Sequence, residues 1–327
     1  MTHKKKKQHE KNNKEQQEQQ VTQDDHHDNQ PNEQQQQEEE VVEPKPQPLI
    51  ELTHGYAYIS LEGFYIDTIG YQRHGISPSL IQNRIQRDGH DHSHITLIHR
   101  KELKLAMEAA NIEFPKKKRK AQAMKNLIQW IMERVGEPSQ WKEYDWPMDL
   151  GLAHVEKQEE EQQQKLTSKA YYRVLHWPLG QKIRALLNLE PAFFHVTIGF
   201  DPKDVHGIYK GPGTLLCLKE QQYPSPLSHH IRFDEVQKEQ QGMIHDLTRL
   251  LYIAPHYTKD MVFLNALANQ CSCYREQLET CRIDWTFIQQ HITRNNNNNN
   301  NNHNKDDDTE ENWPEAPGAS LSPSSSS

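Results

Sequence analysis

The chain is poor in apolar residues, and this shortage sets the first limit on its structure. Only 34% of its 327 residues are hydrophobic, and the mean hydropathy is −1.00. Both values are low for a chain that folds along its whole length. No run of about 18 apolar residues occurs, and the N-terminus lacks the apolar segment of a secretion signal. We therefore expect an intracellular protein without a membrane span, part of which stays disordered.

The two ends of the chain account for the low hydropathy. Residues 1–48 consist almost entirely of Gln, Asn, Glu, Lys and His, and residues 295–327 contain an Asn run, an acidic cluster and a Ser/Pro-rich end. Such segments bury too little apolar surface to offset the entropy lost on ordering. The sequence therefore predicts a disordered tail at 1–48, a folded domain at 49–220, a C-terminal helical extension at 221–294 and a disordered tail at 295–327.

The part of the chain that we expect to fold also lacks an excess of charge of either sign. The two tails contain 8 of the 38 Lys and Arg residues but 17 of the 46 Asp and Glu residues. Residues 49–294 therefore hold 30 basic and 29 acidic side chains, and the formal charge of −8 arises in the tails. A near-neutral folded region argues against broad, nonspecific binding to duplex nucleic acid, but it allows a local basic site.

Cysteine is scarce, and its spacing does not suggest a metal centre. The four cysteines are Cys217, Cys271, Cys273 and Cys281. This number fits a reducing compartment, and the paired Cys-x-x-Cys spacing of a zinc knuckle is lacking. The segment Gly89-His-Asp-His-Ser-His94 places three histidines at alternate positions, which could ligate a metal from one face of a strand. We favour a different role for the last of them, so the sequence predicts neither a metal nor a cofactor.

What the chain does contain is one structural plan used twice. The pattern of apolar residues predicts strands at 55–60, 94–98, 171–177 and 194–200, and helices that start at Pro78 and Pro178. Pro78 lies 16 residues before His94, and Pro178 lies 17 residues before His195. Proline is common in the first turn of a helix. We therefore expect an α+β fold in which two pseudo-symmetric strand-helix-strand lobes face a central cleft.

Other segments connect or extend these lobes. Apolar residues at helical spacing predict helices at 103–111 and 124–135, and two more helices after residue 230 that would cap the fold or bind a partner. The charged run at 156–165 has no apolar face and predicts a solvated loop between the lobes.

Each lobe carries a His-x-Thr pair on its last predicted strand. Residues i and i+2 of a strand share one face, so His94 points with Thr96 and His195 with Thr197. Cleavage of a phosphodiester needs a base and an acid, and histidine titrates near neutral pH. The threonine hydroxyls can donate to the non-bridging phosphate oxygens. One such pair is common by chance, but two copies at equivalent places of a repeat predict an acid–base site without a metal.

The double His-x-Thr motif, each copy followed by an aliphatic residue, resembles the signature of the 2H phosphoesterase superfamily. The segment Phe194-His-Val-Thr-Ile-Gly-Phe-Asp-Pro-Lys-Asp-Val-His-Gly207 is most similar to the fungal and protist group called Swiss Army Knife RNA repair-like proteins. The resemblance covers residues 50–219 and implies a bilobal α+β fold, a central cleft and metal-free hydrolysis of 2′,3′-cyclic or related phosphodiesters. It carries over onto the two His-x-Thr pairs alone, and it leaves open which histidine is the acid.

Three functional hypotheses follow from the sequence. The first is a metal-independent phosphoesterase that acts on the 2′,3′-cyclic phosphate or a related diester of RNA ends or nucleotides, in RNA repair or processing. The second is a module that binds RNA ends without cleaving them, while the tails and C-terminal helices recruit partners. The third is a scaffold whose Gln/Asn-rich tails self-associate.

Four further residues are candidates for substrate binding. His206 and Lys210 follow the second motif and could add positive charge or hydrogen bonds to a second phosphate or a base, with a surface turn as the alternative. Tyr65 and Arg73 precede the first motif and could stack on or clamp a nucleotide, with core packing as the alternative.

One basic segment bears on localisation. The run Pro115-Lys-Lys-Lys-Arg-Lys120 is similar to a short nuclear import signal, so we expect the protein in the cytoplasm or the nucleus. The same run could instead form a solvated loop or a rim that attracts phosphates.

Overall fold

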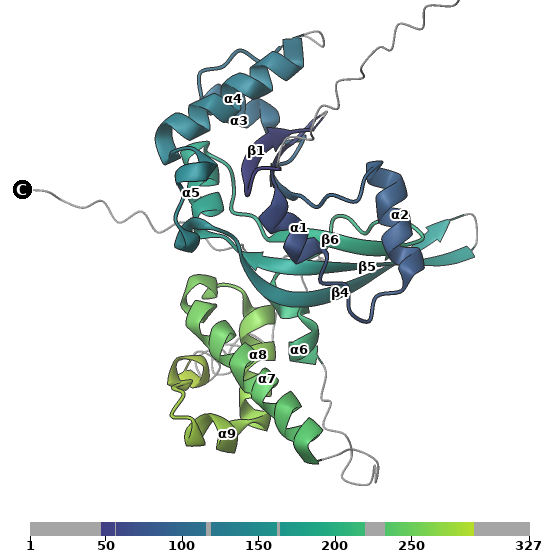
Figure 1. Cartoon of the computed structure of the whole chain (residues 1–327), viewed down its shortest axis with the longest axis vertical. Helices are drawn as coiled ribbons and strands as arrows, with labels where there is room; N and C mark the ends of the chain where they lie inside the picture. Colours follow the sequence, from purple (N-terminus) through teal and green to yellow (C-terminus); the bar gives the residue numbers. More distant parts are fainter. Residues whose placement is uncertain (1–46, 56, 116–118, 162–163, 220–232, 291–327) are drawn as a thin grey trace, which may run out of the picture. The chain divides into compact units, whose positions relative to one another are not determined.

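A computed structural model of the chain describes residues 47–55, 57–115, 119–161, 164–219 and 233–290. All of them belong to one compact unit, residues 46–327. The described residues mix helices with two small antiparallel sheets (Figure 1), which confirms the predicted α+β class. The predicted tail at 295–327, all but the end of the tail at 1–48, and residues 116–118 of the proposed import signal lie outside the described residues.

Each sheet contains three strands and carries one His-x-Thr pair. The first sheet consists of β1 (Glu51–His54), β2 (Ile59–Glu62) and β3 (Ile95–Ile98), and the second of β4 (Met148–Glu161), β5 (Gln164–His176) and β6 (Phe194–Asp201). In both sheets the strands follow one another in sequence order, and the last strand pairs antiparallel with the middle one. The strands β3 and β6 are therefore edge strands, and they lie in contact with each other.

Two of the predicted boundaries are wrong. The strand expected at 55–60 begins only at Ile59, because the amide of Gly55 donates to the carbonyl of Tyr58 and closes a turn there. The loop expected at 156–165 is instead the continuation of the β4–β5 hairpin, whose register runs out to the pair Glu161 and Gln164. Backbone hydrogen bonds hold an antiparallel ladder together, so strands can extend beyond the apolar core in a segment of polar side chains.

The described helices include two that begin at Pro78 and Pro178, as predicted, and two, Phe64–Gly70 and Leu216–Lys219, that were not predicted. In chain order, the described helices are α1 (Phe64–Gly70), α2 (Pro78–Asp88), α3 (Leu103–Ala109), α4 (Lys120–Val135), α5 (Pro178–Leu186), α6 (Leu216–Lys219), α7 (Phe233–Ile253), α8 (Met261–Cys273) and α9 (Arg275–Thr280). Both α2 and α5 have proline in the first turn, as expected. Helix α2 ends at Gly89, whose φ of 78° is a left-handed conformation that glycine adopts without strain.

The helix of each half lies against the His-x-Thr strand of the other half. Helix α2 packs on β6, and α5 contacts β3. The approach of α2 is close at Gly199, because a Cβ atom there would lie 2.7 Å from the backbone of Leu80. This crossed packing brings the two edge strands together although about 100 residues separate them along the chain.

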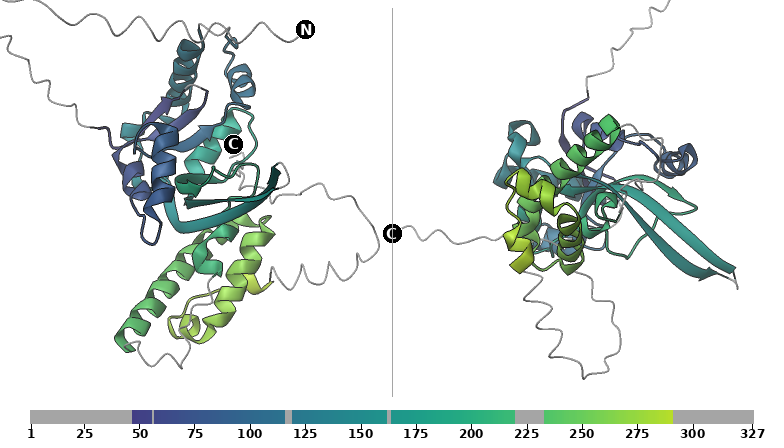
Figure 2. Two further views of the ribbon diagram at one scale, coloured as in Figure 1. Left: turned by 90° about the vertical axis from the view of Figure 1, so that its right-hand side faces the viewer. Right: turned by 90° about the horizontal axis from the view of Figure 1, so that it is seen from below.

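Each face of the second sheet contributes side chains to an apolar core. Its residues Phe194, Val196 and Ile198 belong to the core shared with the first half of the chain. Residues Tyr172 and Val174 belong to a second core that contains the buried side chains of α7 and α8. Helices α6 and α7 contact β4 and lie on the side of the sheet away from α2 (Figures 1 and 2).

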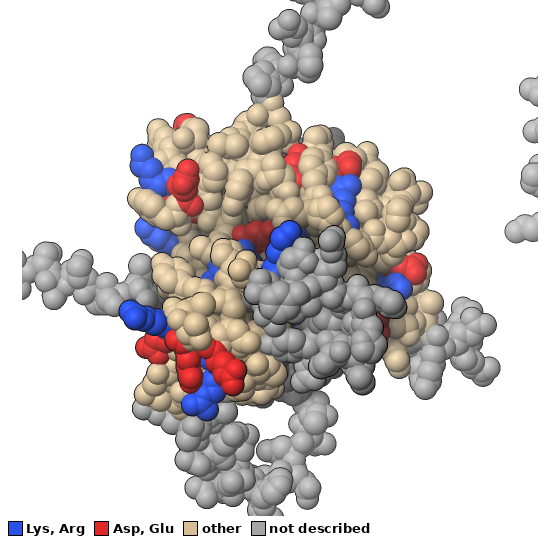
Figure 3. All heavy atoms as spheres, turned by 60° about the horizontal axis from the view of Figure 1, so that its bottom comes forward, with Lys and Arg blue, Asp and Glu red and all other residues tan. Residues whose placement is uncertain are grey.

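Surface charge and hydropathy agree with the sequence analysis of the folded part. On the face shown in Figure 3, basic and acidic side chains occur in small mixed groups on a surface that is mostly neither. In the described part of the chain, no helix combines the length and the apolar character that a membrane span requires. All four cysteines lie in the described part of the chain, where none forms a disulfide, and Cys271 is buried.

Candidate active site

The two edge strands present both His-x-Thr pairs as the strand period requires. Strand β3 begins one residue later than predicted, so His94 lies directly before it; Ile95 and Leu97 are fully buried, whereas His94 and Thr96 are partly exposed. On β6, the same alternation leaves His195 and Thr197 partly exposed, while Val196 and Ile198 are buried. The two histidines are close enough that positive charge on His94 would lower the pKa of His195. The structure therefore brings the two motifs near each other, whereas a cleft between two lobes stays a prediction.

The ring of His195 is held in one orientation and one tautomer. Its Nδ1 lies 3.3 Å from the carbonyl oxygen of Phe193. A carbonyl can only accept a hydrogen bond, so Nδ1 carries the proton and Nε2 keeps a free lone pair. Burial, with a smaller effect of the nearby Lys210, lowers the pKa of His195 to about 3. At neutral pH this imidazole is uncharged and able to accept a proton.

The surroundings of His94 are different. Its ring stacks on Tyr58, with a centroid distance of 5.4 Å and an interplanar angle of 23°. Burial lowers the pKa of His94, but the carboxylates of Asp88 and Glu62 oppose this shift. Negative charge near an imidazole favours its protonated form. Of the two histidines, His94 is therefore the one that acquires a proton more easily.

The two threonines complete the site with uncommitted hydroxyl groups. Thr96 pairs with Ser60 in the first sheet, and Thr197 pairs with Tyr172 in the second. Neither hydroxyl has a hydrogen-bond partner among the residues that the structure describes. Both can therefore donate to an anionic oxygen without breaking a bond inside the protein.

A buried lysine lies beside the second motif. The Nζ of Lys210 is 3.5 Å from Asp204 Oδ1 and 5.2 Å from the centroid of the Tyr172 ring. The Tyr172 ring also meets the ring of His195, with a centroid distance of 5.4 Å. Burial lowers the pKa of Lys210, and the Asp204 carboxylate opposes this shift. Arg87 of α2 binds the same carboxylate at 2.5 Å, so Asp204 joins charged groups from both halves of the chain.

The other predicted substrate-binding residues make contacts within the protein. His206 is largely exposed, and its Nε2 lies 3.9 Å from Asp204. The hydroxyl of Tyr65 donates to the carbonyl of Pro147 at 2.8 Å. Arg73 forms a two-point ion pair with Asp91 at 2.6 and 3.1 Å. The contacts of Tyr65 and Arg73 agree with the alternative that these side chains pack within the protein. Substrate binding by them stays a prediction.

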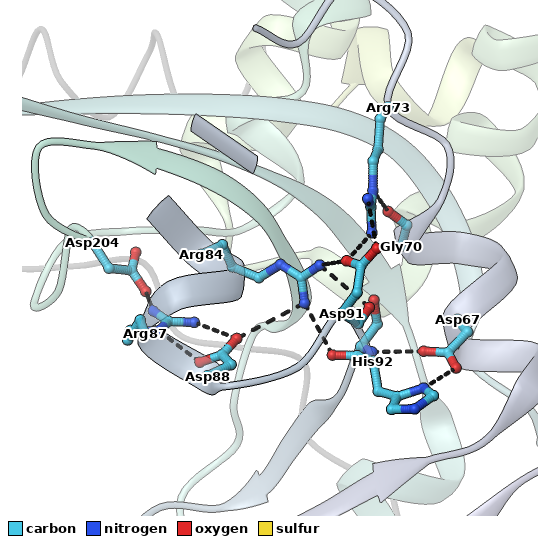
Figure 4. Close-up of polar contacts among 10 residues, drawn as sticks. Asp67, Gly70, Arg73, Arg84, Arg87, Asp88, Asp91, His92 and Asp204 are labelled. Carbon is cyan, nitrogen blue, oxygen red and sulfur yellow. Dashed lines mark hydrogen bonds and ion pairs between the residues drawn. The ribbon is translucent and has the colours of Figure 1, made fainter. Parts of the chain in front are cut away.

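A chain of charged contacts fixes the loop that precedes His94. Its members, in order, are Asp204, Arg87, Asp88, Arg84, Asp91 and Arg73 (Figure 4). In the same loop, the amide of Ser93 donates to buried Asp67 at 2.6 Å, and His92 Nδ1 lies 2.9 Å from the other oxygen of that carboxylate. The three residues directly before His94 are therefore all held by hydrogen bonds or ion pairs, which fixes the position of His94.

Two buried arginines at equivalent places escaped the sequence analysis. Arg84 lies six residues after the proline of α2, and Arg184 lies six residues after the proline of α5. Arg84 donates to the carbonyl of His92, just before the first motif, at 3.0 Å. Arg184 donates to the carbonyls of Glu190 and Leu97 at 2.7 and 2.8 Å. The shared offset from proline was the signal that could have revealed them.

Carbonyls of the two edge strands receive bonds from the opposite half. The Leu97 carbonyl, bonded by Arg184, belongs to β3, and the Phe200 carbonyl of β6 accepts a 2.9 Å bond from Asn83 of α2. An edge strand exposes backbone groups without a ladder partner, and buried ones must be paired. The helices thus fix the positions of both His-x-Thr strands.

The alternating histidines do not form a metal site in the described part of the chain. His90 and His92 lie next to each other, with ring centroids 5.7 Å apart, and His92 is bonded to Asp67. No group of three or more His, Cys, Asp or Glu side chains among the described residues is arranged to hold a metal ion.

Fold and site together define a domain of the phosphoesterase class, in which histidine and threonine pairs on two small sheets converge. More particularly, residues 57–206 match the family model described as Swiss Army Knife, 2H phosphoesterase domain, and this part of the chain belongs to that family. Membership supports a phosphoesterase-type, hydrolytic function. No curated protein and no solved structure matches the chain. Lys210 and the helices after α5 lie outside the matched segment.

Proposed function

We propose that the protein is a metal-independent phosphoesterase that hydrolyses the 2′,3′-cyclic phosphate, or a related phosphodiester, of RNA ends or nucleotides. The observation that carries this proposal is the pairing of His94 and Thr96 with His195 and Thr197 on two edge strands in contact. We regard the two sheets as the lobes of a bilobal site in which the phosphate binds between the motifs. A role in RNA repair or processing would follow from that substrate.

The electrostatic difference between the histidines suggests their roles. His195, whose Nε2 lone pair is free, would take a proton from the attacking water. As the new oxygen–phosphorus bond forms, the bond from phosphorus to the ribose oxygen breaks. His94, which the phosphate anion and the neighbouring carboxylates would help to protonate, would donate its proton to that leaving oxygen. The hydroxyls of Thr96 and Thr197 would donate to the non-bridging oxygens, where negative charge accumulates.

The test is incubation of the full-length protein, with EDTA present, with an RNA oligonucleotide that ends in a 2′,3′-cyclic phosphate. Wild type should open the ring, and His94→Ala and His195→Ala should each lower turnover about 100-fold or more. His245→Ala, which changes an exposed histidine of α7, is the matched control and should behave as wild type. Retained turnover in both site variants would reject the proposal. Binding of the oligonucleotide without any product would favour the rival RNA-end-binding module.

A further inference from the structure

A contact path connects the N-terminus of helix α8 to His195. The hydroxyl of Tyr209 donates to Asp260 Oδ2 at 2.5 Å, and both side chains are buried. Asp260 is the N-cap of α8, because its other oxygen accepts the amide of Phe263 at 3.0 Å. Tyr209 is thereby fixed to a helix that lies outside the segment matched by the family.

Tyr209 in turn contacts Phe193 and directly precedes Lys210, and both of these residues act on His195. Its ring meets Phe193 edge to face, with a centroid distance of 5.0 Å and an angle of 88°. Phe193 provides the carbonyl that holds Nδ1 of His195. Tyr209 also precedes Lys210, whose ammonium group lies on the ring of Tyr172 beside the same histidine.

The segment that follows Lys210 is fixed just as firmly. The amide of Gly213 donates to the Tyr209 hydroxyl at 2.9 Å. The hydroxyl of Thr214 donates to the carbonyl of Gly211 at 2.7 Å and accepts a bond from Tyr172 at 2.8 Å. A Cβ atom on Gly213 would lie 2.8 Å from the backbone nitrogen of Phe263, so the segment packs directly on α8.

We propose that Asp260 and Tyr209 are positioning residues for His195, so that the C-terminal helices complete the active site rather than extend it. This inference rests on the proposed function, since His195 is the base of that reaction. Asp260 orients Tyr209, and Tyr209 places the Phe193 carbonyl that fixes the tautomer and helps to keep His195 buried beside Lys210, where burial and then the lysine charge lower its pKa. The other charged groups that act on His195 are Asp204 and His94.

The test compares Tyr209→Phe and Asp260→Asn with a matched control, Tyr257→Phe. Tyr257 is also a buried tyrosine of the C-terminal part, but its hydroxyl meets Nδ1 of His176, at 3.1 Å, instead of Asp260. The readout is the imidazole of His195 in long-range ¹H–¹⁵N NMR spectra recorded against pH, assigned with His195→Ala. These spectra report tautomer and titration without any substrate.

Tyr209→Phe and Asp260→Asn should raise the titration midpoint of His195 and mix its tautomers, whereas Tyr257→Phe should leave both unchanged. With the cyclic phosphate as substrate, kcat should fall about 10- to 100-fold in the first two variants, as expected when a catalytic group is misplaced. An unchanged His195 signal in Tyr209→Phe and Asp260→Asn would overturn the inference. If the His195 signal shifts in these two variants but the wild-type protein never forms product, the proposed function is rejected and the coupling between Asp260, Tyr209 and His195 stands.

Discussion

The two His-x-Thr strands have the same sequence pattern but different surroundings. His195 is buried and has a lysine nearby, whereas His94 stacks on Tyr58 near two carboxylates. The first environment disfavours a proton on the imidazole, and the second tolerates one. The duplicated motif therefore supplies two chemically identical imidazoles, and their different neighbours give them different proton affinities.

The largest effect that can test this comparison is the response of each histidine variant to the leaving group. The substrates are two nucleoside phosphodiesters that differ only in releasing methanol or p-nitrophenol. Replacement of either histidine by alanine should lower turnover of the methyl ester about 100-fold or more. p-Nitrophenolate departs without a proton, so the loss in His94→Ala should shrink at least about tenfold on the nitrophenyl ester. The loss in His195→Ala should be equal on both esters.

The opposite pattern would exchange the two roles. Equal losses on both esters in both variants would mean that neither histidine protonates the leaving oxygen. The measurement is the initial rate at saturating substrate, with His245→Ala again as the control.

The two equivalent arginines also have unlike surroundings. One bonds within its own half of the chain, and the other joins the two halves. Arg184 pairs with Glu102 and bonds the β3 carbonyl of Leu97, whereas Arg84 bonds only the loop before His94 and its own helix. Arg184→Leu should cost about 3–5 kcal/mol, the usual cost of breaking a buried ion pair. Arg84→Leu should cost less, about 1–3 kcal/mol, because Asp91, one of its two carboxylate partners, is more exposed than Glu102 and the main loss is the bonds to buried carbonyls.

Urea unfolding monitored by circular dichroism measures both costs. Arg134→Leu, which changes an exposed arginine of α4, controls for the loss of charge and should shift the midpoint only slightly. If the Arg184 variant does not fold, Arg184→Lys should fold with an intermediate loss. A loss in Arg184→Leu no larger than in the control would remove the argument that this side chain fixes β3.

The same arginines show where sequence reasoning stops. The strands with His94 and His195 and the helices that start at Pro78 and Pro178 could be predicted, because strand period and proline position are local signals. The offset to the arginines was visible too, but their acceptors are backbone carbonyls, which leave no trace in the sequence. The role of Arg184 follows only from the packing of α5 on β3, and that of Arg84 from the fold of the loop after α2.

Long-range contacts explain the other differences. Tyr65 was a candidate for nucleotide stacking because it is aromatic and precedes the motif, but its hydroxyl bonds Pro147, 82 residues away. The β4–β5 hairpin runs through a charged segment because its ladder depends on the backbone. Asp260 gave no signal, since its link to the site passes through Tyr209, 51 residues earlier.

A smaller effect should come from the two threonines, and it tests whether the two motifs grip the phosphate equally. Thr96→Val and Thr197→Val each remove one donor to the phosphate while retaining the shape of the side chain. One hydrogen bond to a charged group contributes about 1.5–3 kcal/mol, so kcat/KM should fall about 10- to 100-fold in each variant. Thermal stability should not fall, because neither hydroxyl has a partner among the described residues. Thr→Ser at each position should restore most of the activity; no loss in the valine variants would exclude phosphate binding.

The smallest effect concerns stability against pH, and it compares the histidines without any substrate. The folded-state pKa of His195 is about 3, whereas a histidine in an unfolded chain titrates near about 6.5. Between these values the unfolded chain binds more protons, so the contribution of His195 to stability is complete above about pH 6.5 and decreases as the pH falls toward 3. Wild type should therefore unfold at lower urea concentration at about pH 4.5 than at about pH 7. His195→Asn should reduce this difference more than His94→Asn, because carboxylates oppose the shift at His94. An equal reduction in both variants would mean that the two imidazoles have the same proton affinity in the folded protein and would remove the basis for assigning them different roles.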